Sequence, residues 1–482
     1  MNKLEGLDPK RVFYYFEQIS KIPRCSHNEQ NISNYIKNVG EKLGLETIQD
    51  DVLNVIIKKP ATLGYEESEG IIIQGHMDMV CEKEYDSNHD FKKDPIKLKI
   101  HGDYIHGDGT TLGADNGIAI AMGLAILEDD TLEHPSIELL ITSSEEVDMN
   151  GAFGLSENIL KGKRLLNIDS EEEGVLVTGS AGGELIEIRI PTEYEEVSDY
   201  YGVTIGVRGL IGGHSGMEID KPRGNSNKII KDILKEIRKI IDIRLIAMKG
   251  GTKENTIPRQ TIAKIAVKSD DMPIFENIIE EIRENIININ KRKEPKIEII
   301  IKRDDLVSKV LTGNVFDIVT LLLDNIPTGV FTRLPENPKI VESSSNLAII
   351  ETKEENIFIQ VSIRSSAESV LLKLRKKILE EVNKTKMEYS ISDSYPEWEY
   401  NPNSKLRNIA LNLYKEIFDE EMKSTVIHAG LECGVLAKKY PELDIVSFGP
   451  NMYDVHTTKE RLSISSTRRT YEYLVELLKK LR

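Results

Sequence analysis

The sequence predicts an α/β protein into which a second domain, of the α+β class, is inserted. Short apolar runs rich in isoleucine and leucine, such as residues 71–74 and 137–142, are typical of buried strands. Segments with apolar residues three and four positions apart alternate with them and are typical of helices. This pattern changes near residue 184 and changes back near residue 396. Because 482 residues exceed the size of one ordinary core, two domains are expected.

The first part of the chain alternates helices and strands. Helices are expected over residues 8–20, 28–43 and 118–127, and strands over residues 52–57, 71–74, 137–142 and 165–168. Gly44 marks the end of the second helix. A glycine-rich loop, residues 106–117, leads into the third helix, and Gly75 is expected to let the chain turn sharply after its strand.

Longer amphipathic helices characterise the inserted part. Helices are expected over residues 225–241, 273–289 and 367–384, and strands over residues 244–248, 261–267, 297–302, 346–351 and 357–363. A helix at 404–417 and a strand at 444–448 then return to the first pattern. The simplest organisation is a discontinuous domain of residues 1–183 and 396–482, interrupted by a domain of residues 184–395.

Histidine and acidic side chains follow the predicted strands of the first domain or open its helix: His76, Asp115, Glu146 and Asp169. In an open α/β sheet, ligands bind outside the carboxyl ends of the strands. These side chains are therefore expected to meet at one edge of the sheet. A helix cap or a solvated loop residue would explain any one of them, but not the whole succession.

Two imidazoles and three carboxylates form a set of metal ligands: His76, His456, Asp115, Glu146 and Asp169. This set suits Zn²⁺, with Mn²⁺ or Co²⁺ as substitutes. Five ligands are too many for one tetrahedral catalytic zinc that keeps an open position, so two ions about 3.5–4 Å apart are expected. Asp115 is the natural bridge, because its glycine-rich approach can hold a strained backbone between both ions.

Two further carboxylates are expected to support the metals. Asp78 stands two residues from His76 and is suited to orient its imidazole. Glu145 precedes the ligand Glu146, and because adjacent side chains diverge, Glu145 can face the substrate as a general base. An exposed acidic pair is the ordinary alternative, which the hydrophobic strand directly before the pair disfavours.

Composition limits the classes of partner and compartment. A formal net charge of −17 disfavours binding to nucleic acid or to anionic membranes. Cys25, Cys81 and Cys433 form no CxxC pair, so no disulfide framework is expected, which fits a reducing cytoplasm. The N-terminus has no apolar signal-peptide region, and no apolar run approaches about 20 residues, so a cytoplasmic protein without a membrane span is expected.

The motifs around these residues resemble those of the M20 family of co-catalytic zinc peptidases. They comprise residues 75–83, 112–117, 144–146, 167–169, 212–216 and 255–259, together with His456. Residues 22–26 and 428–434 are similar to the aminoacyl-histidine dipeptidase branch of that family, also called Xaa-His dipeptidase or carnosinase. The similarity spans essentially the whole chain.

The resemblance implies a mixed-sheet zinc-peptidase catalytic domain, residues 1–183 and 396–482, with an inserted α+β lid domain, residues 184–395. It implies that His76 and Asp169 complete one zinc site, Glu146 and His456 the other, and that Asp115 bridges them. The peptide bond between Asp115 and Asn116 is implied to be cis. Asp78 would orient His76, and Glu145 would activate the bridging water.

Three residues of the lid are implied to contact substrate. His214, in a Gly-Gly-His-Ser-Gly turn, would donate to the developing oxyanion, in cis or from a partner subunit. Arg364 would clamp the C-terminal carboxylate of the substrate, because a guanidinium offers bidentate geometry. Asn255 would bind the same end. Taken alone, such a histidine or arginine is often an ordinary surface residue.

The resemblance implies a cytoplasmic di-zinc dipeptidase, homodimeric through the lid, that hydrolyses unblocked dipeptides, Xaa-His and β-Ala-His among them. A deacylase of N-acyl amino acids and an aminotripeptidase are the near alternatives. A metal-free binding protein on the same fold is the remote one, disfavoured because all five ligands and Glu145 are present. Ser144 stands where relatives often have aspartate, and Val147-Asp148 where a smaller residue is usual; both leave the dipeptide preference open.

Overall fold

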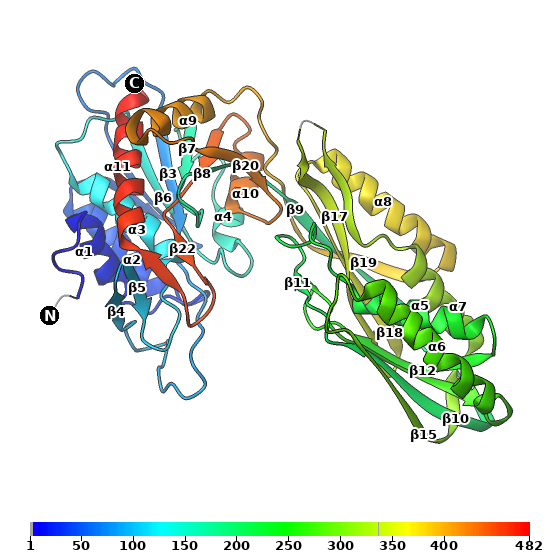
Figure 1. Cartoon of the computed structure of the whole chain (residues 1–482). Coiled ribbons are helices and arrows are strands. Elements are labelled where there is room, and N and C mark those ends of the chain that lie inside the picture. The colour runs from blue at the N-terminus through cyan, green and yellow to red at the C-terminus, as the bar shows by residue number, and fades with distance from the viewer. Residues whose placement is uncertain (1–2, 336) are drawn as a thin grey trace. The chain divides into compact units, whose positions relative to one another are not determined.

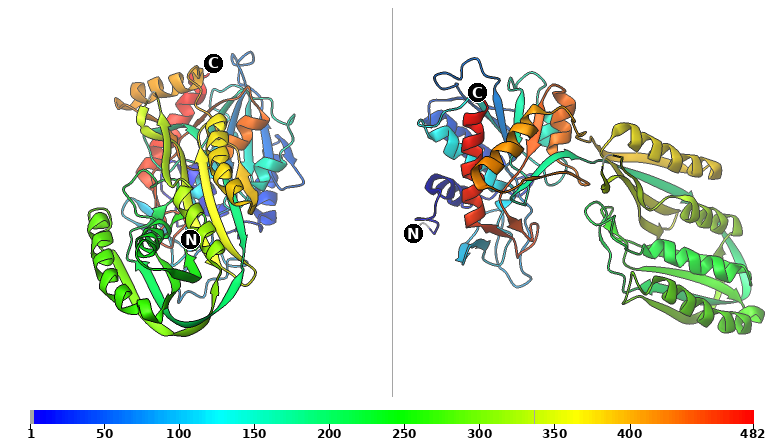
Figure 2. Two further views of the ribbon diagram at one scale, coloured as in Figure 1. Left: turned by 90° about the vertical axis from the view of Figure 1, so that its right-hand side faces the viewer. Right: turned by 45° about the horizontal axis from the view of Figure 1, so that its top comes forward.

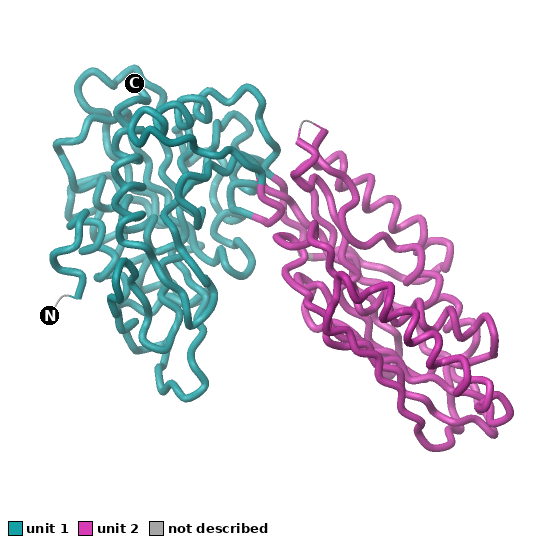
Figure 3. The backbone as a smooth tube through the Cα atoms, in the orientation of Figure 1, with its two compact units in different colours: residues 1–179, 398–426, 431–482 teal, residues 180–397, 427–430 magenta. Residues whose placement is uncertain are grey.

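The computed structural model describes residues 3–335 and 337–482 (Figures 1 and 2). The chain forms two compact units (Figure 3). Unit 1 comprises residues 1–179, 398–426 and 431–482, and unit 2 comprises residues 180–397 and 427–430. The expected boundaries at 183/184 and 395/396 lie within four residues of these divisions. The short return of residues 427–430 to unit 2 was not expected.

Unit 1 is built on an eight-stranded mixed sheet. In spatial order its strands are β1 (Glu46–Gln49), β2 (Val55–Lys59), β6 (Ile137–Thr142), β3 (Ile71–His76), β7 (Arg164–Asn167), β21 (Asp444–Ser447), β8 (Val175–Ser180) and β20 (Lys423–Ile427). The central strand β3 runs parallel to both β6 and β7. Every residue of β3 and β6 is buried, which explains their unbroken apolar runs.

The strand register places the polar side chains at one edge. His76, the last residue of β3, pairs with Thr142, the last residue of β6, and Gln74 pairs with Asn167 at the end of β7. The residues that follow β3, β6 and β7 therefore lie next to one another at the carboxyl edge of the sheet.

Helices cover this sheet and supply its core. They are α1 (Lys10–Ile19), α2 (Gln30–Lys42), α3 (Ala114–Glu128), α4 (Asn150–Gly154), α9 (Lys405–Phe418), α10 (Glu432–Lys439) and α11 (Ile464–Lys480). Every residue of α3 from Asn116 to Leu127 is buried, so this helix is apolar on all sides. The sharp turn expected at Gly75 does not occur, since β3 continues to His76. A Cβ at Gly75 would instead lie 2.3 Å from the Asn116 Oδ1 atom and 2.4 Å from the Ala119 Cβ atom, so close packing against α3 requires glycine.

A small second sheet joins distant segments of unit 1. Its strands, in spatial order, are β22 (Met452–Tyr453), β23 (Arg461–Ser463), β5 (Tyr104–Gly107) and β4 (Leu98–His101). The antiparallel pairing of β23 with β5 sets Leu462 opposite Ile105. The loop between β22 and β23, which carries His456, is thereby fixed to the segment that opens the glycine-rich loop.

Unit 2 is an antiparallel sheet with long helices. The order of its strands is β15 (Glu298–Leu311), β10 (Tyr194–Arg208), β14 (Thr261–Lys268), β12 (Ile243–Gly250), β17 (Asn337–Thr352), β18 (Asn356–Ser365), β9 (Gly182–Pro191) and β19 (Glu388–Tyr395), with β16 (Gly329–Leu334) paired to β17. The helices α5 (Ser226–Arg238), α6 (Met272–Asn290), α7 (Gly313–Asn325) and α8 (Glu368–Thr385) lie along it (Figure 2). The expected helices match α5, α6 and α8, whereas α7 was not predicted. The predicted fold class, α/β with an inserted α+β domain, is confirmed.

The cysteine expectation was wrong. Cys25 and Cys81 form a disulfide with a Cα–Cα separation of 5.7 Å, and only Cys433 is free and buried. The two segments meet through a bridge between Cys25 and Met79, 54 positions apart. The spacing of the two cysteines in the sequence does not reveal this disulfide, because only the tertiary fold brings their segments together. Among the described residues, no helix combines the length and the apolar character needed to cross a membrane.

Candidate metal centre

Asp115 stands between two histidines at the carboxyl edge of the sheet. Its Oδ1 atom lies 3.3 Å from the Nε2 atom of His76, and its Oδ2 atom lies 3.2 Å from the Nε2 atom of His456. The two oxygens thus face different imidazoles. Asp115 and Asn116 depart from helical backbone angles at the start of α3, and the peptide bond between them is cis, as the resemblance implied.

Further carboxylates complete both sides of this arrangement. Asp169 Oδ1 lies 3.5 Å from His76 Nε2, and Glu146 Oε2 lies 2.9 Å from His456 Nε2. Ligand atoms of His76, Asp115 and Glu146 all lie within 4.8 Å of one another. The five side chains predicted as metal ligands therefore come together, and Asp169 joins the His76 side while Glu146 joins the His456 side.

Glu145 borders the same cluster without pairing closely with either histidine. Its Oε2 atom lies 3.9 Å from His76 Nε2, farther than the carboxylates of Asp115 and Asp169. The preceding residue, Ser144, has a left-handed backbone (φ 53°), and its N–H and hydroxyl both donate to Glu29 Oε1. This anchored turn directs the two consecutive glutamates differently.

Asp78 is fully buried beneath the cluster and organises its backbone. Its Oδ1 atom lies 3.3 Å from His76 Nδ1 and accepts the N–H of Glu145 at 3.0 Å. Its Oδ2 atom accepts the Ser26 hydroxyl at 2.7 Å and the Glu146 N–H at 3.2 Å. Although burial acts to raise it, hydrogen bonds led by that from His76 lower the pKa of Asp78. The Asp78 carboxylate thus contacts the His76 ring, whose Nδ1 also lies 3.2 Å from the Asp78 backbone carbonyl oxygen, and it accepts from the loop that carries both glutamates.

The pKa values of the clustered side chains indicate which ligand the cluster fits. Burial acts to lower the pKa of His76, but neighbouring carboxylates, Asp169 foremost, raise it well above its usual value. Hydrogen bonds to Asp115 and Glu146 likewise outweigh burial and raise the pKa of His456 to about 11. Burial raises the pKa of Asp169 to about 6 and that of Glu145 well above its usual value. The negative charge of so many buried carboxylates must be balanced by positive charge. Divalent cations would supply that charge in place of the protons on His76 and His456, so the donor set fits metal ions.

Several residues that support this centre lie within motifs of the resemblance, but their contacts could not be predicted from the sequence. Arg24, 2% exposed, donates to the carbonyl oxygens of Met77, Asp78 and Gly113. Glu432, fully buried, accepts from the Gln74 amide at 2.7 Å and the Thr142 hydroxyl at 2.6 Å. Asn116 Nδ2 donates to the Ile168 carbonyl at 2.6 Å, and its Oδ1 accepts the His76 N–H at 3.2 Å. These polar groups connect neighbouring strand ends under the ligands, a role visible only in three dimensions.

The remaining predicted site residues, His214, Asn255 and Arg364, belong to unit 2. His214 Nδ1 accepts the N–H groups of Gly216 at 3.2 Å and Met217 at 3.1 Å, which places the proton of the neutral ring on Nε2. Asn255 lies in the loop before β13 (Thr256–Ile257), and its backbone carbonyl oxygen accepts the Ser215 N–H at 2.7 Å.

Arg364 is 9% exposed on β18, and its Nη1 donates to the Tyr395 hydroxyl at 2.7 Å. Its Nε atom is buried and has no hydrogen-bond partner among the described residues. A half-satisfied buried guanidinium is consistent with a site for an anionic group. Beside it, Ser344, which is opposite Arg364 in the strand register, contacts His428 Nε2 at 2.7 Å.

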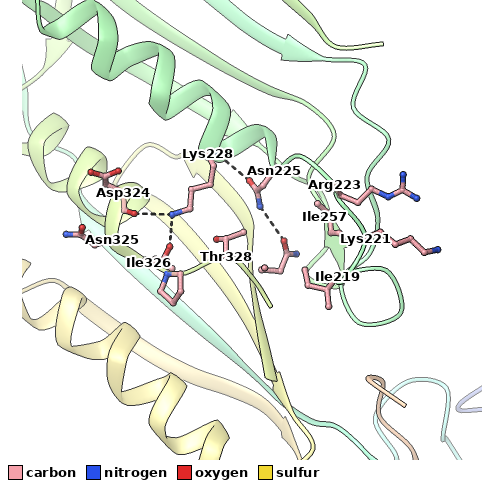
Figure 4. A pocket seen from close by; sticks show the side chains of 13 residues that line it. Ile219, Lys221, Arg223, Asn225, Lys228, Ile257, Asp324, Asn325, Ile326 and Thr328 are labelled. Atoms are coloured by element: carbon pink, nitrogen blue, oxygen red, sulfur yellow. Dashed lines mark hydrogen bonds between the residues drawn. The ribbon is translucent and has the colours of Figure 1, made fainter. Parts of the chain in front are cut away.

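A separate pocket of unit 2, about 450 Å³ in volume, contains none of the predicted site residues (Figure 4). Within it, Lys228 Nζ donates to the carbonyl oxygens of Leu323 and Ile326, each at 2.6 Å. Burial lowers the pKa of Lys228 to about 8. The lysine therefore caps the end of α7, a structural role.

An open mixed sheet that gathers imidazoles and carboxylates at its carboxyl edge, with a second domain inserted, defines a metal-dependent hydrolase. Residues 72–480 match the model of the family described as Peptidase family M20/M25/M40. The chain belongs to this family, as the resemblance implied, and is a metallopeptidase.

Individual relatives match the chain from end to end. It is 35% identical to the cytosol non-specific dipeptidase of Escherichia coli (strain K12), over 100% of this chain and 99% of that protein. The crystal structure of aminoacylhistidine dipeptidase from Vibrio alginolyticus is 33% identical, covers 99% of this chain and 97% of its own, and has a TM-score of 0.91. A tripeptidase from Staphylococcus aureus, 16% identical with a TM-score of 0.58 over 98% of this chain and 99% of its own, shares the fold.

Proposed function

We propose that this chain is a cytoplasmic dipeptidase that holds two divalent metal ions, zinc by preference, and hydrolyses unblocked dipeptides, Xaa-His among them. The observation that carries the proposal is the division of the Asp115 oxygens between His76 and His456. The end-to-end similarity to two proteins named as dipeptidases supports the substrate class. The cytoplasmic location rests on the name of the E. coli relative, since the cysteines of this chain no longer support it.

In this proposal Asp115 would serve both ions, His76 and Asp169 would hold one, and Glu146 and His456 would hold the other. Ions bound there would supply Lewis-acid chemistry, which acidifies water and polarises a carbonyl. Mn²⁺ or Co²⁺ can substitute, because the nitrogen and oxygen donors suit them as well. Asp78 keeps the His76 ring oriented and holds the Glu145–Glu146 backbone in place.

Glu145 acts as the general base in this scheme. Its carboxylate borders the ligands without a closer partner among the histidines, and burial raises its pKa, which suits a group that takes and returns a proton. Glu145 removes a proton from the attacking water and then donates it to the departing amine. Attack forms the new C–O bond and a tetrahedral oxyanion, whose collapse breaks the scissile C–N bond. The amine leaves with the proton from Glu145, and the product acid releases the second proton of the water, so a carboxylate and an amine result.

Unit 2 supplies the substrate contacts of the proposal. His214, with its ring proton on Nε2, donates to the oxyanion. Arg364 and Asn255 bind the C-terminal carboxylate of the dipeptide. The buried Arg364 Nε, which has no hydrogen-bond partner in the described part of the chain, supports this assignment. We also propose a homodimer formed through unit 2. In such a dimer His214 could act on the substrate of its own chain or on that of the partner subunit, so the oligomeric state tests both points. Elution of the active enzyme as a monomer at micromolar concentration would contradict the dimer and action in trans.

The first test is hydrolysis of β-Ala-His, Gly-His, Leu-Gly and N-acetyl-Leu by zinc-loaded protein, with a chelator-treated control. Cleavage of the three free dipeptides alone, abolished by chelation, is expected. Preference for N-acetyl-Leu would identify a deacylase, and a free tripeptide cleaved faster than any dipeptide would identify an aminotripeptidase. Absence of turnover with metal bound would overturn the enzymatic proposal.

A further inference from the structure

Glu460 has an unusual environment for a glutamate outside the ligand set. It is 2% exposed, and its two oxygens accept four consecutive backbone N–H groups. The Oε2 atom accepts from Leu112 at 2.7 Å and Gly113 at 2.9 Å, and the Oε1 atom accepts from Ala114 at 2.8 Å and Asp115 at 3.3 Å. These donors belong to the segment that ends at the central aspartate of the metal centre.

Those N–H groups need an acceptor that the local sequence does not provide. Two of them, on Ala114 and Asp115, are among the first N–H groups of α3, which have no partner within the helix, and the other two belong to the residues directly before it. At the start of α3 the capping position is Gly113, in a left-handed conformation (φ 70°), and a glycine has no side chain that could accept them. A carboxylate from 345 positions away takes the place of the usual local cap.

The loop that supplies Glu460 also supplies His456. His456 has a left-handed backbone (φ 60°), and its Nε2 lies 3.2 Å from Asp115 Oδ2. The Glu460 N–H donates to the Thr457 carbonyl at 3.1 Å, and the Thr457 hydroxyl donates to the Asp454 carbonyl at 2.7 Å, so the loop is internally tied. One loop therefore contacts Asp115 at two places, its carboxylate through His456 and its backbone through Glu460.

We propose that Glu460 is a positioning residue that assembles the His456–Asp115–Glu146 side of the metal centre. Glu460 fixes residues 112–115 against the loop of residues 454–460 and so sets the separation of two ligands that are far apart in the chain. Glu460 contacts neither substrate nor metal in this role. The inference rests on the proposed di-metal function and deepens it, because it names what holds the second site together.

The chemistry of the contact identifies an informative variant. A carboxylate only accepts hydrogen bonds, whereas a carboxamide of the same size accepts at one end and donates at the other. In Glu460→Gln, two of the four backbone N–H groups would face an NH₂ group, so the segment before Asp115 must shift. All five proposed ligands remain present in this variant. A change in metal affinity would therefore show that the positions of the ligands have changed.

Unit 1 contains a matched control. Glu138 is 6% exposed and accepts the N–H groups of Lys161 at 2.7 Å and Gly162 at 2.8 Å. It stands near the start of β6, whereas the glutamates of the centre follow the end of that strand. Glu138→Gln disturbs a buried carboxylate of the same kind without touching the metal ligands.

The experiment titrates zinc into chelator-stripped wild type, Glu460→Gln and Glu138→Gln, with circular dichroism to confirm folding. Glu460→Gln should weaken zinc binding roughly 10- to 100-fold at the site of His456 and Glu146, as losses of supporting hydrogen bonds do, and less at the site of His76 and Asp169, which shares only Asp115 with it. Excess zinc should restore kcat for Gly-His, with KM unchanged. Glu138→Gln should keep both affinities, even where its Tm falls.

Wild-type affinity for both ions in Glu460→Gln, or equal weakening in Glu138→Gln, overturns the inference. If Glu460→Gln does not fold, Glu460→Asp replaces it, since its shorter carboxylate cannot reach all four donors. Glu460→Asp should then weaken the same site, and wild-type affinity in that variant also overturns the inference. Failure of the wild-type protein to bind zinc, or to hydrolyse any dipeptide when loaded, would instead refute the proposed function.

Discussion

Asp115 and His456 lie 3.2 Å apart, from Oδ2 to Nε2, although 341 positions separate them in the chain. The other Asp115 oxygen lies 3.3 Å from His76. A carboxylate whose oxygens face opposite histidines can bridge two cations in one centre. This relationship and the carboxylates around it should determine how metal binding responds to pH and to substitution.

Metal affinity should rise with pH. Metal-free His456, with its pKa raised to about 11, and Asp169, with its pKa raised to about 6, must lose protons before they bind metal. Lower pH keeps those protons in place and weakens binding, and higher pH removes the competition. Zinc titration calorimetry from about pH 6 to pH 8, in buffers of different ionisation enthalpy, should show tighter binding and net proton release. A pH-independent affinity would contradict the proposed ligand set.

Glu145→Gln should remove the general base while keeping the fold and both metals. We expect kcat for Gly-His to fall by roughly 10²- to 10⁴-fold, the usual range for loss of a proton-transfer group. Steady-state kinetics with metal analysis would measure both quantities. Asp148→Asn, an exposed acid of the same loop, is the control and should keep its activity. Near-normal kcat in Glu145→Gln would exclude this base.

Asp78→Asn should weaken both the fold and the metal centre. The carboxylate accepts the N–H groups of Glu145 and Glu146 and the hydroxyl of Ser26, so an amide NH₂ there would face donors. About 1–3 kcal/mol of stability should be lost, and metal affinity should fall roughly 10- to 100-fold. Denaturant unfolding and zinc titration would measure these. Ser26→Ala, which removes one donor only, should show a smaller loss; equal losses would contradict the role of Asp78.

The Cys25–Cys81 disulfide should stabilise unit 1. It closes a loop over a sequence separation of 56, and a crosslink of this size typically contributes roughly 2–4 kcal/mol by restricting the unfolded chain. A dithiol reductant should therefore lower the Tm of the wild-type protein. The same reductant should leave the Tm of Cys25→Ser unchanged, which serves as the matched control. An equal Tm for wild type and variant without reductant would show that the bond contributes nothing.

Arg364→Lys should impair substrate binding more than turnover. A lysine cannot offer the bidentate geometry with which a guanidinium meets a carboxylate, so KM for Gly-His should rise by about tenfold or more. The amide of the same dipeptide, which has no carboxylate, should be affected little. Arg375→Lys, whose guanidinium pairs with Glu184 elsewhere in unit 2, provides the comparison. A loss of kcat at unchanged KM would argue against a carboxylate clamp.

Much of the fold follows from local pattern. The predicted strand over residues 137–142 is the observed β6, and the expected strand over residues 71–74 is extended by two residues in β3. Both are buried along their whole length, so their apolar runs are unambiguous. By contrast, α7, residues Gly313–Asn325, was missed, and β15 and β17 are much longer than expected, because packing within unit 2 extends them beyond their apolar cores.

In the candidate site too, some residues could be predicted from local pattern, whereas other features depend on tertiary packing. His76, Asp115, Glu146 and Asp169 could be predicted because each follows a strand or opens a helix, and the parallel register then brings them to one level. Gly75 was assigned a turn that does not exist; its reason is the close approach of Asn116 and Ala119, which no local pattern encodes. Cys25 and Cys81 were expected to stay unpaired for the same reason, since their spacing says nothing of the bridge that joins their segments.

From the sequence alone one could predict the α/β class with its inserted domain, the family, and the side chains that we propose as metal ligands. The class follows from short-range periodicity and the family from the resemblance of short motifs, and both are local properties of the chain. The tertiary structure was needed to show that the two oxygens of Asp115 face different histidines and that the carboxylates of Asp78 and Glu460 accept hydrogen bonds from the surrounding backbone. Such hydrogen bonds join segments tens to hundreds of residues apart, and their partners are selected by how the strands and loops pack.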